Sequence, residues 1–289
     1  MRTFQRACTA AAALLLVLGV TAFSYHRAPG DRAPSRPAAH LAASTAIPRP
    51  GHPIVAAPGQ HGMADILRHH SSVIHSLNWS GYAVGRPLAS FRNVRAAYFV
   101  PYVDCAGTPN SYSSHWVGLD GLGSASVEQV GVAAGCAGTA AQYYAWYEMY
   151  PKAVSVEFSV HPGNSILASV YYDAARRKFV LRLRDITTGK HFSKTLKCAA
   201  SACTRSSAEV ISEAPSSAAG QILPLADYRA ASFSSVSVTN ARGHRGGLHT
   251  KWWHTYQIVG TGPVTHEVTA QPTVLYQGQA FSVYWFQQN

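Results

Sequence analysis

The chain has 289 residues, with 24 Lys and Arg against 13 Asp and Glu, which gives a formal net charge of +11 at pH 7. It is 47% hydrophobic and only 13% charged, which excludes an intrinsically disordered protein and predicts a packed core. Its 15 Tyr, 23 Gly and 16 Pro favour strands and turns, and Glu, Lys and Leu are too sparse for a long helical bundle or coiled coil.

The N-terminus predicts a secretory signal peptide over residues 1–24. Arg2 and Arg6 precede an apolar run at 7–20, and small residues follow it. The run is short for a bilayer span, so we expect cleavage, with an uncleaved signal anchor as the alternative. We therefore predict a secreted, extracellular protein that leaves the membrane after signal cleavage.

The segment 25–77 differs in composition from the rest of the chain. It holds seven prolines and many Ala and His, and aromatic residues are nearly absent. Such a segment buries little apolar surface and is typical of a propeptide or linker, with a short helix expected over Met63–Ile74. At Asn78 the composition changes to Trp, Tyr, Val and Gly, so we place the folded domain at 78–289.

Basic residues are dispersed along the chain. Arg176-Arg177-Lys178 is the longest basic run and lies at a predicted turn, which is typical of a solvated loop and argues against a nucleic-acid partner. There is no HExxH sequence, no paired Cys-x-x-Cys, no phosphate loop and no dinucleotide fingerprint. We therefore expect no metal and no cofactor.

Four cysteines follow the signal peptide, an even number that predicts disulfides in an exported chain. Four cysteines allow three pairings. Cys198 and Cys203 are close enough to join the end of one hairpin, which favours this pair together with Cys105–Cys136.

Most of 78–289 alternates between apolar and polar residues with a period of two, which is typical of strands. We predict strands over 96–100, 155–160, 165–172, 178–185, 191–196, 232–239, 253–259 and 281–286, with a turn at 187–190. Many short strands without intervening long helices predict an all-β fold, an antiparallel sandwich or barrel.

Two carboxylates stand out from the few acidic residues. Glu148 lies inside the aromatic run 143–151, and Glu213 follows Glu209 by four residues, which places both on one face of a strand. An apolar setting raises the pKa of a carboxyl group, which is how general acids arise. An ion pair on a sheet face is the alternative. A serine nucleophile is disfavoured because G-x-S-x-G is absent.

Five motifs, in this order, resemble the glutamic peptidases, or eqolisins. They are NWSGY at 78–82, WVGLDG at 116–121, VEQVGV at 127–132, AWYEMYP at 145–151 and AEVISE at 208–213. They span nearly the whole of 78–289. The resemblance implies a lectin-like, concanavalin-like sandwich of two antiparallel sheets and an exported endopeptidase that cleaves polypeptides in acid.

By this resemblance the catalytic residues are Gln129 and Glu213. Glu213 would take a proton from water and return it to the leaving amine. Gln129 would donate to the tetrahedral oxygen and hold the water. Trp146 and Glu148 would line the cleft, with Glu148 as a hydrogen-bond partner for the substrate or for the catalytic pair.

Trp79 and Asp120 are further substrate contacts implied by the resemblance, although a core tryptophan and a turn aspartate are equally good interpretations. The sequence departs from the family pattern at Ala133 and Tyr144, where the family has Asp. These departures affect the polarity and the subsites of the cleft more than the reaction.

The resemblance also suggests a role for the prosegment. We expect the basic, His-rich 25–77 to cover an acidic cleft near neutral pH as an inhibitor and to be released in acid, and we expect a monomer. Two other functions stay open. One is a non-catalytic carbohydrate-binding sandwich that stacks Trp and Tyr on sugars, and the other is a cationic envelope-binding protein whose binding falls steeply with salt.

Overall fold

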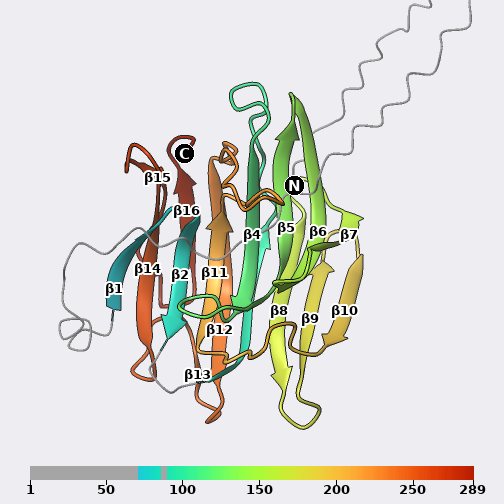
Figure 1. Cartoon of the computed structure of the whole chain (residues 1–289), viewed down its shortest axis with the longest axis vertical. Coiled ribbons are helices and arrows are strands. Elements are labelled where there is room, and N and C mark those ends of the chain that lie inside the picture. The colour runs from blue at the N-terminus through green and yellow to red at the C-terminus, as the bar shows by residue number, and fades with distance from the viewer. Residues whose placement is uncertain (1–70, 86–89) are drawn as a thin grey trace, which may run out of the picture. The chain divides into compact units, whose positions relative to one another are not determined.

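A computed structural model describes residues 71–85 and 90–289, and these residues form an all-β fold without an α-helix (Figure 1). The strands are β1 (Ser71–Ser76), β2 (Trp79–Gly85), β3 (Phe91–Phe99), β4 (Tyr112–Leu119), β5 (Val127–Ala137), β6 (Ala140–Tyr150), β7 (Ser155–Ser159), β8 (Ser165–Asp173), β9 (Lys178–Asp185), β10 (His191–Leu196), β11 (Ser207–Glu213), β12 (Ala230–Asn240), β13 (Arg245–Gly246), β14 (His254–Thr261), β15 (Val268–Pro272) and β16 (Phe281–Trp285). The predicted signal peptide and most of the predicted propeptide lie outside the described residues. Within the described ranges, no helix has the length and apolar character needed to cross a membrane.

All eight strands predicted from the alternation are present, although β3 begins earlier than predicted, at Phe91. The helix expected over Met63–Ile74 is wrong for residues 71–74, because they belong to β1. This strand pairs in parallel with β14, from Ser71 opposite Thr255 to Ser76 opposite Gly260. Main-chain pairing to an existing sheet thus overrides the amphipathic pattern of the segment.

The strands form two packed layers. They follow one hydrogen-bonded path, in the order β10-β9-β8-β3-β12-β16-β15-β14-β2-β11-β4-β5-β6-β7, and every pair along it is antiparallel. The path folds back on itself, since β3 and β8 pack against β4, and β8 and β9 pack against β5. This is the predicted two-sheet antiparallel sandwich.

In one layer, β2, β11, β4 and β5 are buried on both faces, and the neighbouring β6 is largely buried only in its second half. Successive residues of a strand point to opposite faces. In β4, Val117 joins the large core between the layers, whereas Trp116 joins a second apolar cluster with Trp79, Trp146 and Ile211 on the outer face. The second cluster forms the base of the candidate site.

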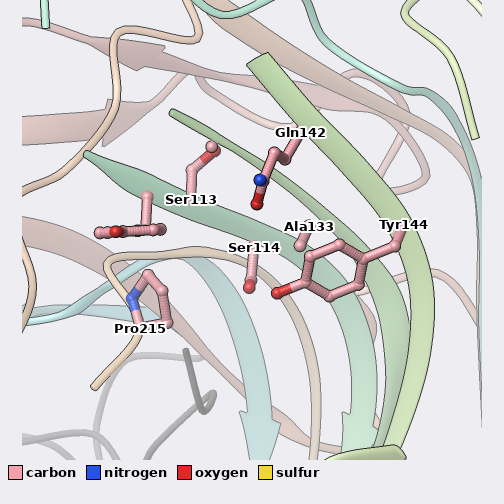
Figure 2. Close-up of a pocket in the computed structure, with 8 residues that line it drawn as sticks. Ser113, Ser114, Ala133, Gln142, Tyr144 and Pro215 are labelled. Carbon is pink, nitrogen blue, oxygen red and sulfur yellow. The ribbon is translucent and has the colours of Figure 1, made fainter. Parts of the chain in front are cut away.

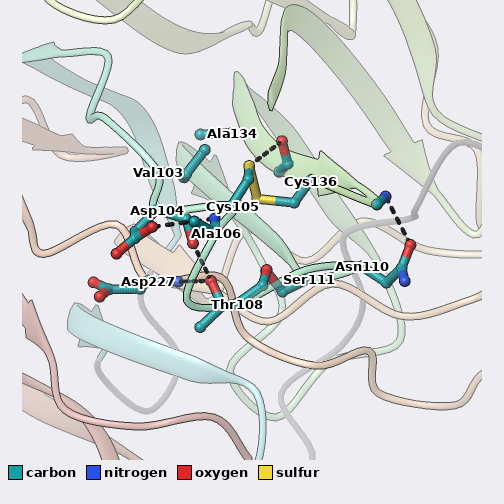
Figure 3. Close-up of a disulfide and its surroundings, with 12 residues drawn as sticks. Val103, Asp104, Cys105, Ala106, Thr108, Asn110, Ser111, Ala134, Cys136 and Asp227 are labelled. Carbon is teal, nitrogen blue, oxygen red and sulfur yellow. Dashed lines mark hydrogen bonds between the residues drawn. A yellow bond between two sulfur atoms is a disulfide. The ribbon is translucent and has the colours of Figure 1, made fainter. Parts of the chain in front are cut away.

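Both favoured disulfide pairings are confirmed, Cys105–Cys136 and Cys198–Cys203. Figure 3 shows the first, which ties the loop after β3 to the end of β5. Beside it the Cys136 N–H donates to the carbonyl of Ser111 (2.7 Å), and the N–H of Gly138 donates to Asn110 Oδ1 (2.8 Å). These contacts fix the start of β4 against the end of β5.

Candidate active site

The strand register brings the predicted site residues onto one face. Gln129 of β5 lies opposite Glu148 of β6 on one side and Gly118 of β4 on the other, and Gly118 lies opposite Glu209 of β11. Glu213 follows Glu209 by four residues in β11 and lies on the same face, because strand residues separated by an even number of positions point to the same side. One face thus carries an amide and three carboxyl groups.

Gln129 and Glu148 form a buried hydrogen-bonded pair. Both side chains are completely buried, and Gln129 Nε2 donates to Glu148 Oε2 at 2.7 Å. Gln129 Oε1 is also buried and has no hydrogen-bond partner among the described residues. A buried amide oxygen usually has a partner, so this atom is available to accept a hydrogen bond from water or substrate.

Glu213 is completely buried, and two donors among the described residues hold its carboxylate. Trp116 Nε1 donates to Oε2 at 2.7 Å, and Asn78 Nδ2 donates to Oε1 at 3.2 Å. Asn78 is itself held by β1, because Ser76 Oγ donates to Asn78 Oδ1 at 3.2 Å and accepts the N–H of Trp79 at 3.1 Å. Sequence reasoning did not identify Trp116 and Asn78 as partners of Glu213. Their place in two of the five motifs was the available signal.

The Trp116 ring spans the face between Gln129 and Glu213. A Cβ added at Gly118 would lie 2.8 Å from Trp116 Cζ3 and 3.4 Å from Gln129 Cβ, whereas the Nε1 edge of the same ring donates to Glu213. Gly131 lies opposite Trp116, and a Cβ there would lie 2.5 Å from Trp116 Cβ. The two glycines therefore leave room for the indole, which forms the floor between the amide and the carboxylate.

The predicted substrate contacts Trp79 and Trp146 lie in the buried cluster of this face. The rings of Trp79 and Trp116 meet edge to face with centroids 4.8 Å apart. Trp146 is 1% exposed. This placement supports the interpretation of Trp79 as a core residue, and contact of either ring with substrate stays a prediction.

Asp120 follows β4 and is completely buried. Its carboxylate accepts hydrogen bonds from Thr204 Oγ1 (2.8 Å), the Arg205 N–H (2.6 Å) and the Ser206 N–H (2.8 Å). These bonds anchor the segment that leads into β11 and hence into Glu213. The contact with substrate implied for Asp120 stays a prediction.

Two further carboxyl groups near Asp120 are buried without partners. Glu128 and Glu209 are completely buried, and none of their four carboxyl oxygens has a hydrogen-bond partner among the described residues. Burial and, less strongly, the charge of Asp120 raise the pKa of both carboxyl groups well above the usual value of 4.5. In acid both are therefore neutral.

His115 lies on the inner face of β4, beneath the site. Its ring lies between Ser113 Oγ (3.2 Å) and Ser212 Oγ (3.0 Å). Complete burial lowers the pKa of this imidazole from 6.5 to about 3. His115 is therefore neutral over most of the acid range.

One face of the β-sandwich thus carries an amide–carboxyl pair and a second, separately held carboxylate. The sequence profile of the peptidase A4 family matches residues 77–276. The chain belongs to this family, the glutamic peptidases or eqolisins, and is a glutamic-type endopeptidase.

Solved structures share the fold of this chain. Scytalidoglutamic peptidase, crystallised with a peptide-based transition state analogue, is 24% identical, with 72% of this chain and 98% of that chain covered and a TM-score of 0.60. SCP-B, an eqolisin crystallised with the tripeptide Ala-Ile-His, is 24% identical with the same coverage and a TM-score of 0.58. Aspergilloglutamic peptidase from Aspergillus niger is 23% identical, with 61% and 99% covered and a TM-score of 0.52. No curated protein sequence matches the chain.

Proposed function

We propose that this endopeptidase is secreted, acts in acid and uses Glu213 and Gln129 as its catalytic pair. The observation that carries the proposal is the arrangement of one face. Among the described residues, a buried carboxylate is held by two donors, a buried amide oxygen has no hydrogen-bond partner, and a single indole lies between them.

The chemistry follows from the groups present. Glu213, as a carboxylate, takes a proton from water while the water oxygen attacks the peptide carbonyl carbon. The Gln129 amide has two N–H groups; Glu148 accepts one of them, and the other is left for the oxyanion. Gln129 Oε1 accepts a hydrogen bond from the attacking water. Glu213 then gives its proton to the amine nitrogen as the C–N bond breaks, which restores the carboxylate.

Glu148 is a positioning residue in this scheme. Its carboxyl group fixes the rotamer of the Gln129 amide, so that the remaining N–H and Oε1 face the substrate. Polypeptides are the substrates. The carbohydrate-binding alternative gains no support from this face, since its tryptophans are buried.

The test is hydrolysis of denatured casein by the secreted protein between pH 2 and 7, in the presence of pepstatin. We expect cleavage that is confined to acid and is unaffected by pepstatin. A processed, folded protein that cleaves nothing under these conditions would contradict the proposal and would favour a binding module.

Processing is expected to remove a prosegment but to retain β1. A chain that begins at Ser71 keeps the β1–β14 ladder and Ser76, whereas a chain that begins at Asn78 loses the contacts that β1 makes with Asn78, which donates to Glu213. We expect the shorter chain to melt at a lower temperature at pH 4 and to lose most of its caseinolytic activity. Ser76→Ala in the longer chain removes the hydroxyl contact with Asn78 but keeps β1, so it distinguishes the effect of this contact from the effect of the strand. Equal melting and activity of the two chains would show that the predicted start at 78 is sufficient.

Autocatalytic release of the prosegment is a separate expectation. A Glu213→Gln zymogen, purified and acidified alone, should stay full-length on a gel while the wild-type zymogen shortens. Addition of a trace of active wild-type enzyme should then shorten the variant, which shows that its cleavage site is intact. Shortening of the isolated variant in acid would contradict the expectation.

A further inference from the structure

A hollow lies on the Glu213 side of the candidate site, between β4, β5 and β6 (Figure 2). Its empty space is about 280 Å³, most of which belongs to the open mouth, so the enclosed part is small. It is lined by Tyr112, Ser113, Ser114, Ala133, Gly135, Gln142, Tyr144 and Pro215.

The register places this hollow directly beside Glu213. Ser114 is the cross-strand neighbour of Glu213, Ala133 is the next residue across the sheet and Tyr144 the one after that. Pro215 follows Glu213 by two residues and closes the hollow on the opposite side from Tyr144 (Figure 2). A peptide with its scissile bond at Glu213 would therefore place a neighbouring side chain here.

The lining carries no charge in acid. It contains no Asp, Glu, Lys, Arg or His, and burial raises the pKa of the Tyr144 phenol, which keeps that hydroxyl neutral. Ala133 and Gly135 keep the base of the hollow small, and the rings of Tyr112 and Tyr144 contribute the largest apolar surfaces. An ionised side chain placed here would lose hydration and meet no opposite charge, only the neutral amide of Gln142 and neutral hydroxyl groups, whereas an apolar side chain has no such hydration to lose.

The walls are pre-formed. The Tyr112 N–H donates to the carbonyl of Pro224 (2.8 Å), and Cys136, adjacent to Gly135, is held by its disulfide to Cys105 and by its hydrogen bond to Ser111. A rigid, small, uncharged hollow can select one class of side chain, because it cannot rearrange to solvate another.

We propose that this hollow is a specificity subsite that admits an uncharged, aliphatic or aromatic substrate side chain next to the scissile bond and excludes charged ones. The proposal rests on the proposed function, because it uses Glu213 as the point of cleavage. Ala133 is its specificity-determining residue, since it lies at the base of the hollow, where a larger or charged side chain would change what fits.

The test is a cleavage profile on a mixture of peptides at pH 5, read by mass spectrometry. We expect the wild type to show one position near the cut that is enriched in aliphatic or aromatic residues and depleted in Lys, Arg, Asp and Glu. In Ala133→Asp, cleavage of peptides with Lys or Arg at that same position should rise about tenfold or more relative to apolar ones, because the new carboxylate offers a partner. Ala133→Leu should instead shift the position towards Gly and Ala, and it introduces no charge that could prevent folding.

Ala140→Asp is the matched control, because it makes the same substitution at an exposed position at the start of β6. Its profile should equal that of the wild type. If the wild type cleaves peptides but both Ala133 variants retain its profile, the subsite proposal is wrong and the proposed function stands. If the wild type cleaves no peptide in acid, the proposed function itself fails.

Discussion

Glu213→Gln will lower kcat/KM for denatured casein by about 10³-fold or more, and Gln129→Ala will lower it by about 10²–10³-fold. An amide cannot take a proton from water, so Glu213→Gln removes the base. Trp116 Nε1 and Asn78 Nδ2 both donate to the carboxylate, so the single side-chain oxygen of the glutamine can accept from one of them, and the melting temperature of the variant checks its fold. Gln129→Ala removes the N–H aimed at the oxyanion, and one such donor is typically worth about 2.7–4 kcal/mol in the transition state.

The companion variant is Glu148→Gln. Its side-chain oxygen still accepts the Gln129 N–H, so we expect a smaller loss of activity than for Gln129→Ala. The loss should lower kcat and leave KM unchanged. Activities are measured at pH 3–6 on proteins with unchanged melting temperatures. The double variant of Glu213 and Gln129 should be little worse than Glu213→Gln, because the two groups act in one step. Activity that survives in both single variants would place the site on other residues.

The alternation of apolar and polar residues predicted the strands whose outer face is exposed. β8, β9, β10 and β12 each alternate between buried and exposed residues. β2 and β11 are buried at every position, and β4 and β5 at nearly every one, because one face meets the other layer and the opposite face carries the tryptophan cluster. A period of two disappears from such strands. They are the strands that hold the site, and only their motifs identified them.

The partners of the site residues could not be predicted from local sequence. Asn78 lies 135 residues from Glu213, and Trp116 lies 97 residues from it. Their contact depends on β11 being placed next to β4 and close to the start of β2, which is a property of the sandwich topology. The placement of Glu209 and Glu213 on one face was predictable, because it requires only that the segment is a strand.

The pH dependence of stability is the second large effect that we expect, and it arises from groups outside the catalytic pair. Below the unfolded pKa of about 4.5, Glu128 and Glu209 are protonated in both the folded and the unfolded protein. As the pH rises above that value, the unfolded chain releases these protons while the folded chain retains them, so the free energy of unfolding falls. Each carboxyl contributes up to about 1.4 kcal/mol per pH unit until its folded pKa is reached.

His115 acts in the opposite direction. As the pH falls below 6.5, the imidazole of the unfolded chain becomes protonated, whereas that of the folded protein stays neutral down to about pH 3. The free energy of unfolding therefore falls towards acid pH. Between 4.5 and 6.5 the two carboxyl groups outweigh the single histidine. Considering these three groups together, stability should be greatest near pH 4.5.

The groups around the two carboxyls support this direction. The charge of Asp120 disfavours ionisation of both glutamates, the charge of Glu128 disfavours ionisation of Glu209, and the Arg205 guanidinium opposes this effect at Glu128. Ser126 at Glu128, and Ser207 and the Leu122 N–H at Glu209, make no full hydrogen bond to these carboxyl oxygens and favour the charged forms less than burial disfavours them. Ionisation above neutral pH would therefore place unpaired charge beside the Asp120 anchor that leads into β11.

Glu128→Gln with Glu209→Gln tests this balance. Thermal unfolding is followed from pH 3 to 8 in a Glu213→Gln background, which avoids self-cleavage. We expect the parent to lose stability steeply from pH 5 to 7.5 and the double variant to become most stable near or above pH 6.5, where only His115 shapes the curve among these groups. The exposed Glu267→Gln is the control and should leave the curve unchanged. A parent whose melting temperature is constant from pH 4.5 to 7.5 would show that the buried carboxyls ionise without cost, and the acid preference would then have to come from catalysis alone.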